Sequence, residues 1–142
     1  MDIVIFHNPN CGTSRNVVRL VQDAGYTPNV VEYLQSGWTK PMLQALFAAA
    51  DITPRQALRV HKSPAEDLGL TDKHVSDDQL LDAMVEHPIL VNRPLVACPN
   101  GTKICRPSGA VLPLLDNWPS APYAKEDGSL ILDNDGNIVP GA

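Results

Sequence analysis

Cys11 is the residue of this sequence best placed to act as a nucleophile. It follows a short apolar run, residues 2–6, and stands immediately before residues 17–24, where apolar side chains recur at helical spacing. Residues 12–14 should therefore form the first turn of a helix, with unpaired backbone N–H groups pointing back towards the sulfur. A helix start favours negative charge and lowers the pKa of a cysteine for the same reason. The segment is typical of a nucleophile, of an anion-binding turn, or of both.

Four arginines are candidates for the groups that bind an anion beside this thiol. Their planar fork of N–H donors matches the oxygens of a tetrahedral oxyanion, which a lysine does not. Each arginine alone is typical of a solvated surface charge. The four together with a thiol at a helix start favour a functional role over a surface one. The four are Arg15, Arg59, Arg93 and Arg106.

Composition limits the classes of protein to consider. The chain has 142 residues, 44% of them hydrophobic and 19% charged, and a formal net charge of −5. This fits one globular domain that needs no disulfide or metal to fold, and the charge argues against a nucleic-acid partner. We expect no membrane partner and a cytoplasmic location, because no signal peptide or apolar stretch of membrane-spanning length is visible.

The cysteine and histidine pattern predicts free thiols and no metal site. The three cysteines form no C-x-x-C pair, so a reducing compartment with at least one functional thiol is favoured over a disulfide framework. Cys98 and Cys105 lie in or beside strand-like stretches, which is typical of small buried hydrophobes. His61, His74 and His87 show no ligand spacing, and no nucleotide-binding motif occurs, so no bound cofactor is expected.

The periodicity predicts a β-α-β unit, a helical middle and a β-β-α end. The first part is a strand over residues 2–6, a helix over 13–24 and a strand over 29–34. In the middle, residues of N-cap type at Thr39, Thr53, Ser63 and Ser76 open helices, and the one at Thr53 should include Arg55 and Arg59. The last part contains strands over 94–98 and 103–105 around the turn 99–102, a helix from Ser108 to Leu115 bent or weakened by Pro113, and a small hairpin of 130–132 with 138–139.

This order predicts the fold class: α/β, a thioredoxin-like mixed β-sheet with flanking helices and a helical insert between the β-α-β and β-β-α parts. We expect one domain over residues 1–142, with the insert at about 39–87 and a flexible tail at about 129–142, frayed at Pro140 to Ala142. The outer ends of the hairpin strands should meet, which would make Arg93 and Arg106 neighbours. By analogy with this fold, the Arg93–Pro94 peptide bond is expected to be cis.

Several separated blocks of the sequence resemble the glutaredoxin-coupled arsenate reductase family. They appear in the same order from the first strand to about Gly128. The blocks are His7 to Asn16, Leu58-Arg59, His87 to Pro94, Cys105 to Ser108, and Lys125 to Gly128.

The resemblance implies a thioredoxin-like fold with a helical insert and a single catalytic cysteine at Cys11. It also implies that Arg59, Arg93 and Arg106 bind the oxyanion, which would be arsenate or another small oxyanion. Glutathione would then serve as the thiol co-substrate and glutaredoxin as the protein partner. A resolving thiol supplied by another molecule is consistent with Ser14, which stands where a C-x-x-C protein has its second cysteine.

Three further residues are supporting candidates. In the family, the histidine that matches His7 is thought to help lower the pKa of the nucleophile, although a backbone-bonded histidine would look the same. Ser14 lies on the same helix face as Cys11, and its hydroxyl is positioned to donate to the sulfur or to serve only as a first-turn residue. Arg15 should point along the helix, either assisting the anion site or facing solvent.

Other readings of the same residues lead to different functions. A phosphatase loop needs five residues between its cysteine and arginine, whereas Cys11 and Arg15 have three between them. A thioredoxin-fold regulator that binds RNA polymerase commonly has C-x-x-C, which is absent here. A glutathione-dependent thiol protein without arsenate reductase activity is the nearest alternative, and loss of one of the three anion-binding arginines would favour it.

Overall fold

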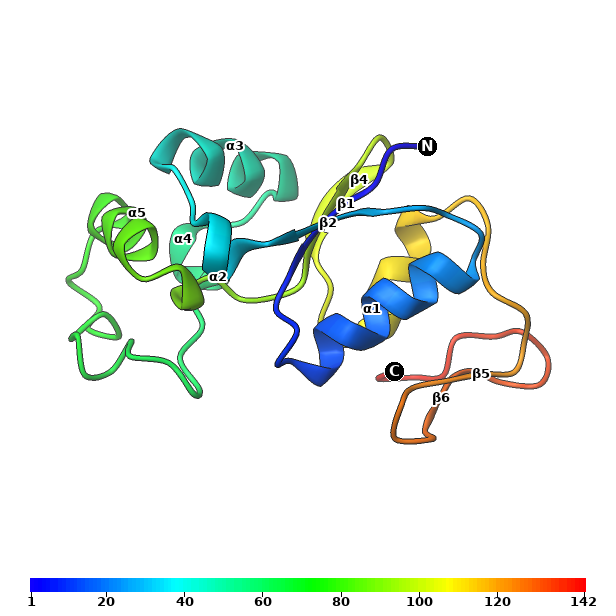
Figure 1. The fold of residues 1–142 in the computed structure, drawn as a ribbon. Coiled ribbons are helices and arrows are strands. Elements are labelled where there is room, and N and C mark those ends of the chain that lie inside the picture. The colour runs from blue at the N-terminus through cyan, green and yellow to red at the C-terminus, as the bar shows by residue number, and fades with distance from the viewer. The chain divides into compact units, whose positions relative to one another are not determined.

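The computed structural model describes all of residues 1–142 and divides into two compact units. Unit 1 comprises Met1–Glu32 and Arg93–Ala142, and unit 2 comprises Tyr33–Asn92. The first unit contains the β-sheet and Cys11, and the second is helical (Figure 1). Unit 2 thus occupies the place in the sequence where a helical insert was expected, while a single domain stays a prediction.

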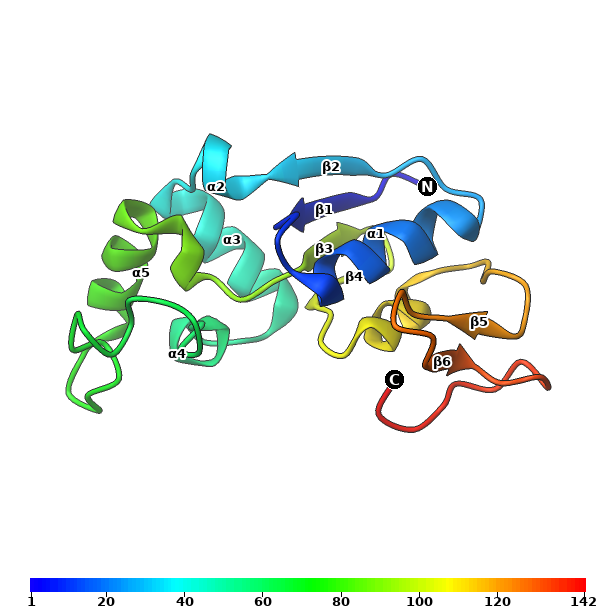
Figure 2. The same ribbon diagram turned by 60° about the horizontal axis from the view of Figure 1, so that its bottom comes forward.

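Unit 1 is built on a four-stranded mixed sheet in the order β2-β1-β3-β4. Strand β1 pairs in parallel with β2 and antiparallel with β3, and β3 pairs antiparallel with β4. This is the β-α-β plus β-β-α arrangement expected from the sequence, so the thioredoxin-like fold class is confirmed (Figure 2). The elements of this unit are β1 (Val4–His7), α1 (Gly12–Asp23), β2 (Asn29–Glu32), β3 (Leu95–Cys98), β4 (Gly101–Ile104), the 3₁₀ helix η2 (Ser108–Leu114), β5 (Tyr123–Ala124) and β6 (Leu130–Leu132).

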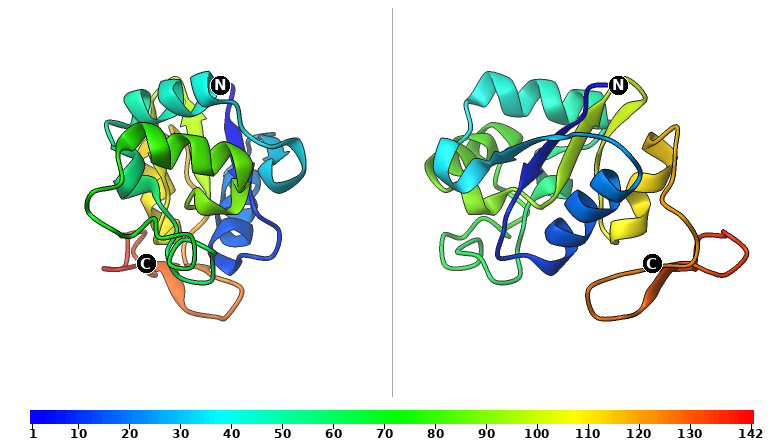
Figure 3. Two further views of the ribbon diagram at one scale, coloured as in Figure 1. Left: turned by 90° about the vertical axis from the view of Figure 1, so that its left-hand side faces the viewer. Right: turned by 45° about the vertical axis from the view of Figure 1, so that its right-hand side comes forward.

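The core of unit 1 lies where the sheet, α1 and η2 meet. Ile5 from β1 and Val96 from β3 pack with Val17 and Leu20 from α1 and with Leu112 from η2, and all five are fully buried. The right-hand view of Figure 3 shows α1 and η2 side by side. Because α1 is fixed along its length by these apolar contacts, its first turn, and with it Cys11, has a defined place at the end of β1.

The last helix and the tail differ from their predicted forms. The segment after Arg106 is a 3₁₀ helix that contains Pro113, whose ring would clash in an α-helix with the carbonyl four positions earlier. Strand β6 pairs mainly with β5, and the predicted partner contributes only an isolated bridge, between Leu132 and Ile138. The end expected to be frayed is packed, because Ala142 is buried and its carbonyl accepts from the Gly109 N–H at 2.9 Å.

Unit 2 contains helices whose starts the sequence predicted well. Thr39 accepts from the Met42 N–H as the N-cap of α3, and Thr53 and Ser76 form capping boxes at α4 and α5. Lys40 of α3 donates to Asp78 and Asp82 of α5, at 2.7 and 2.9 Å. The elements are α2 (Tyr33–Ser36), α3 (Lys40–Ala50), α4 (Pro54–Ala57), α5 (Asp77–Glu86) and the 3₁₀ helix η1 (Pro88–Leu90).

Three predictions in this unit are wrong. No helix starts at Ser63, because its hydroxyl bonds the backbone of neighbouring residues, among them the carbonyl of Val60 and the N–H of Ala65, and stabilises turns instead. The strand predicted to reach residue 34 ends earlier, since Tyr33 begins α2, is buried, and donates its hydroxyl to a backbone carbonyl. Helix α4 ends at Ala57, so Arg59 follows the helix rather than belonging to it.

Candidate active site

Cys11 is the N-cap residue of α1 and is largely buried, with 8% of its surface exposed. Its φ and ψ of −106° and 120° are extended, and no side chain caps the helix. The loop before it is tied by the Cys11 N–H, which donates to the carbonyl of Asn8 at 3.1 Å. The Ser14 backbone N–H donates to the sulfur. The first turn therefore directs a helix-start donor at the thiol, as the sequence predicted.

Two arginines from the β3–β4 hairpin face the same sulfur. Arg106 Nη1 lies 3.6 Å from Cys11 Sγ and also donates to the carbonyl of Arg93 at 3.0 Å. Arg93 is buried, with 6% exposed, and its guanidinium hydrogen-bonds to Cys11. The prediction that these two arginines are neighbours is confirmed, as is the cis Arg93–Pro94 peptide bond.

These contacts decide the ionisation of Cys11. Burial is the largest influence and by itself would raise the pKa of this thiol. Hydrogen bonds from the Ser14 backbone, Arg93 and Arg106, with the positive charge of Arg93, outweigh burial and lower the pKa of Cys11 to about 7. About half of the thiol is therefore ionised near neutral pH, so the side chain is an available nucleophile.

The Ser14 side chain is not placed as the sequence suggested. Its Oγ lies 2.5 Å from His7 Nδ1 and accepts from the Asn8 N–H at 3.1 Å, and all three residues are buried. It is the backbone N–H of Ser14, not its hydroxyl, that bonds Cys11. Burial lowers the pKa of His7, Glu32 partly opposes this and Arg15 adds to it, so His7 is neutral at pH 7. His7 thus fixes Ser14, and through it the first turn.

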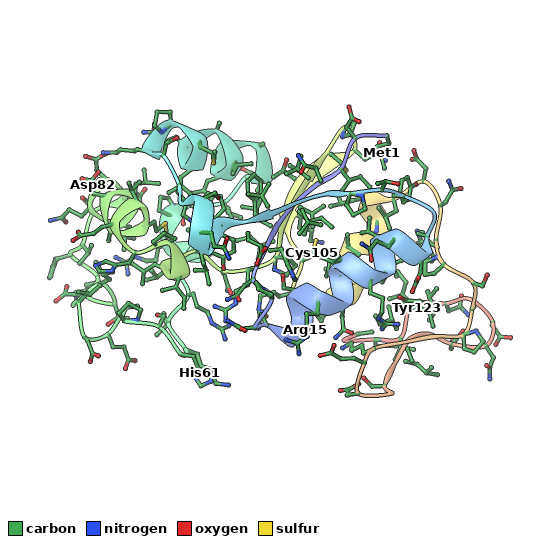
Figure 4. The ribbon with its side chains drawn as sticks, viewed as in Figure 1. Met1, Arg15, His61, Asp82, Cys105 and Tyr123 are labelled. Atoms are coloured by element: carbon green, nitrogen blue, oxygen red, sulfur yellow. The ribbon has the colours of Figure 1, made fainter.

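Arg15 lies at the outer side of the same turn and is held by an acidic residue distant in sequence. Its guanidinium donates to both carboxylate oxygens of Glu126, at 2.6 and 3.3 Å, and to the carbonyl of Pro9 at 2.8 Å. Figure 4 shows Arg15 at the N-terminal end of α1. The structure therefore ties Arg15 to the thiol loop and to the segment after β5, while its side chain stays exposed to solvent, which was one of the two expectations.

Arg59 and the other two cysteines are the remaining residues to place. Arg59 belongs to unit 2, where its backbone N–H donates to the carbonyl of Leu90 at 2.7 Å, and its part in anion binding stays a prediction. Burial raises the pKa of Cys105 to about 12, and this residue packs in the core of unit 1. Cys98 and Cys105 are both free thiols. No group of three His, Cys, Asp or Glu side chains is arranged to hold a metal ion.

Two residues at this end of α1 were not predicted as part of the site. Glu126 was noticed only within a sequence block, and nothing in the sequence pairs it with Arg15, 111 residues away. Asn16 follows Arg15 and is buried, and its Oδ1 accepts from the Glu126 N–H at 2.9 Å. The sequence had one signal for Asn16, because this polar residue stands at a position of α1 that faces the protein interior.

None of the helices combines the length and apolar character that crossing a bilayer requires. A buried thiol of lowered pKa, at a helix start and beside two guanidinium groups, gives this structure a nucleophile next to an anion-attracting site. The fold and this site define a thioredoxin-like protein with one activated cysteine.

Comparison with known proteins identifies the family. Residues 6–114 match the model of the ArsC family. An arsenate reductase of Synechocystis sp. is 64% identical over 137 residues, which cover 96% of this chain and 98% of the relative. One from Escherichia coli is 44% identical over 135 residues, covering 95% and 96%. The solved structure of an arsenate reductase from Vibrio cholerae superposes with a TM-score of 0.77 at 35% identity, over 81% of this chain and 98% of that one. The chain belongs to the ArsC family.

Proposed function

We propose that this protein reduces arsenate to arsenite, with glutathione as thiol co-substrate and glutaredoxin as protein partner. The observation that supports this most is the single activated thiol, Cys11, beside Arg93 and Arg106. Relatives that are 64% and 44% identical over nearly their whole length are named arsenate reductases. The activity, the reductants and the residue roles are parts of one proposal.

In the first step, the Cys11 thiolate attacks the arsenic atom of arsenate. A sulfur–arsenic bond forms and one oxygen leaves as water after protonation, while arsenic remains pentavalent. The guanidinium groups of Arg93 and Arg106, with Arg59 as a third, neutralise the oxyanion and the charge on the departing oxygen. The same donors would accept other small oxyanions of this shape.

In the second step, the sulfur of glutathione attacks Cys11 Sγ. The sulfur–arsenic bond breaks and its electron pair stays on arsenic, which becomes trivalent and leaves as arsenite. A disulfide between Cys11 and glutathione remains, so the two thiols together have supplied two electrons. A glutaredoxin thiolate then attacks the glutathione sulfur and regenerates the Cys11 thiolate.

External thiols are needed because no cysteine stands at the resolving position of the C-x-x-C pattern. Ser14 stands at the resolving position, and Cys105 is buried in the core with a raised pKa. A reaction that consumes glutathione in each turnover belongs in a reducing compartment, so we propose that the protein works in the cytoplasm.

The test is arsenite production by purified protein supplied with arsenate, glutathione and glutaredoxin. We expect turnover with all components, and its loss when glutathione or glutaredoxin is left out or when Cys11 is replaced by serine. Cys98→Ser serves as the matched control, because it removes a thiol of unit 1 that does not contact Cys11, and it should retain activity. Turnover by Cys11→Ser would contradict the mechanism, and turnover without either thiol partner would contradict the proposed reductants.

A further inference from the structure

A cavity of about 260 Å³ opens at the start of α1, next to the thiol, and plays no part in the steps above. Gly12 and Thr13, which directly follow Cys11, form one wall, and Pro107, which directly follows Arg106, forms another. The remaining lining residues are Asn16, Ser108, Lys125, Glu126 and Asp127. All of them belong to unit 1.

The amide nitrogen of Asn16 is the most informative atom of this cavity. The residue is 94% buried, since only 6% of it is exposed. Its Oδ1 accepts from the Glu126 N–H at 2.9 Å and from Arg19 Nη2 at 3.5 Å, so the donors around it fix which end of the amide is oxygen. Nδ2 then has no protein acceptor, and it is not among the atoms fully shielded from solvent. An amide donor left in this way is suited to a ligand oxygen.

Other groups of the cavity also leave donors available, and Asp127 Oδ2 is the one carboxylate oxygen of the lining without a protein donor. The Lys125 ammonium is in no ion pair, and the Thr13 hydroxyl makes no hydrogen bond to the protein. The carboxylate of Glu126 is held by Arg15, and Asp127 Oδ1 accepts from both the N–H and the hydroxyl of Ser129. The Asn16 amide, the Lys125 ammonium and the Thr13 hydroxyl are therefore the unoccupied donors of this cavity, and an anionic oxygen is a suitable acceptor for them.

We propose that this cavity binds a carboxylate of glutathione and so positions the co-substrate thiol towards Cys11. This inference rests on the proposed function for the identity of the thiol. Glutathione has a carboxylate at each end of its chain and its thiol between them, so a carboxylate held beside Cys11 leaves the thiol within a few bonds' reach. Asn16 Nδ2 and the Lys125 ammonium are the two donors that we assign to it.

An inorganic oxyanion has the same oxygen chemistry, so the experiment must separate the two sources. The probe is S-methylglutathione, which has both carboxylates but no free thiol, measured by calorimetry on the full chain with Cys11→Ser. Inorganic phosphate is the second ligand. We expect S-methylglutathione to bind, and we expect phosphate not to displace it.

Asn16→Asp is the sharpest variant, because aspartate keeps the oxygen that accepts the Glu126 N–H and replaces the amide donor with a negatively charged oxygen. Loss of a hydrogen bond to a charged ligand should weaken S-methylglutathione binding about tenfold or more. Lys125→Met, at the surface, should weaken it about threefold. Lys103→Met is the matched control, since Lys103 is exposed on β4 and does not line the cavity, and it should bind normally.

Steady-state kinetics provide the second readout, with Cys11 restored. Asn16→Asp and Lys125→Met should raise the KM for glutathione, with the KM for arsenate and the kcat at saturating glutathione unchanged. A raised KM for arsenate instead, or displacement of S-methylglutathione by phosphate, would assign the cavity to the oxyanion and overturn the proposal. Normal binding of S-methylglutathione both to Lys125→Met and to a folded Asn16→Asp would also overturn the proposal. Arsenite production by the unsubstituted protein tests the proposed function separately, because calorimetry on Cys11→Ser does not depend on turnover.

Discussion

The pH dependence of Cys11 alkylation tests directly how the structure stabilises the thiolate. Burial and hydrogen bonding act on this sulfur in opposite directions, and their balance gives a pKa of about 7. The rate of reaction with iodoacetamide should therefore rise with pH and level off above about pH 8, because the reagent reacts with the thiolate alone.

The expected difference in alkylation rate follows from the ionisation curves of Cys11 and of an ordinary cysteine. At pH 6, a pKa of about 7 leaves about 9% of Cys11 as thiolate, against about 0.3% for an ordinary cysteine with a pKa of about 8.5. A more stable thiolate is also less nucleophilic, by about fivefold for this difference in pKa. Cys11 should therefore react about six times faster than an ordinary thiol at pH 6, and about four times slower at pH 9.

The assay measures modification of each cysteine by mass spectrometry, so that Cys98 and Cys105 are counted separately. Arg106→Gln removes the guanidinium that lies 3.6 Å from the sulfur and should move the inflection to higher pH. Lys103→Met removes an exposed positive charge from the same hairpin and should leave the inflection in place. An inflection near pH 8.5 in the unsubstituted protein, or no shift in Arg106→Gln, would refute the reasoning.

Three further outcomes follow from the contacts. Arg93→Lys should raise the KM for arsenate about tenfold, because one ammonium replaces a planar fork; an unchanged KM would remove Arg93 from the proposed oxyanion site. Ser14→Ala should lower the free energy of unfolding by about 1–3 kcal/mol in a urea titration, since it leaves two buried groups without their partner, yet the pKa of Cys11 should change little because the backbone N–H remains. Gly109→Ala should cost about 1–3 kcal/mol in the same titration, because a Cβ there would lie 2.5 Å from the carbonyl oxygen of Ala142, and an unchanged midpoint would contradict this close packing.

The sequence predicted those parts of the fold that depend on local signals. The caps at Thr39, Thr53 and Ser76 were found because a capping residue and its partner lie within four positions of each other. The start at Ser63 has the same local pattern and failed, since its hydroxyl bonds backbone groups in a turn instead. The packing of Ala142 against Gly109 joins residues far apart in the chain, and no local pattern reports such a contact.

The candidate site also has features that the sequence predicts and features that it does not. The helix-start position of Cys11 and the closeness of Arg93 and Arg106 follow from a strand-helix boundary and from hairpin geometry, so they were predictable. The pairing of Arg15 with Glu126 was not, because the segment after β5 carries no periodic pattern that fixes where it returns to α1. Sequence alone left the Ser14 hydroxyl either donating to the sulfur or serving only as a first-turn residue, and it missed the bond to His7.

The contacts of Arg106 also bear on how one site could serve both the thiolate and the substrate. Its Nη1 is 3.0 Å from the carbonyl oxygen of Arg93 and 3.6 Å from the sulfur, both within the ordinary range for their acceptor atoms, so the backbone contact helps to fix where the guanidinium stands. That contact does not depend on the charge of Cys11. When the thiolate gives up its negative charge by bonding to arsenic, the guanidinium would stay in place, with its remaining N–H groups available to the oxygens that then bear the charge. A donor held by the main chain in this way needs no rearrangement between stabilising the nucleophile and stabilising the adduct.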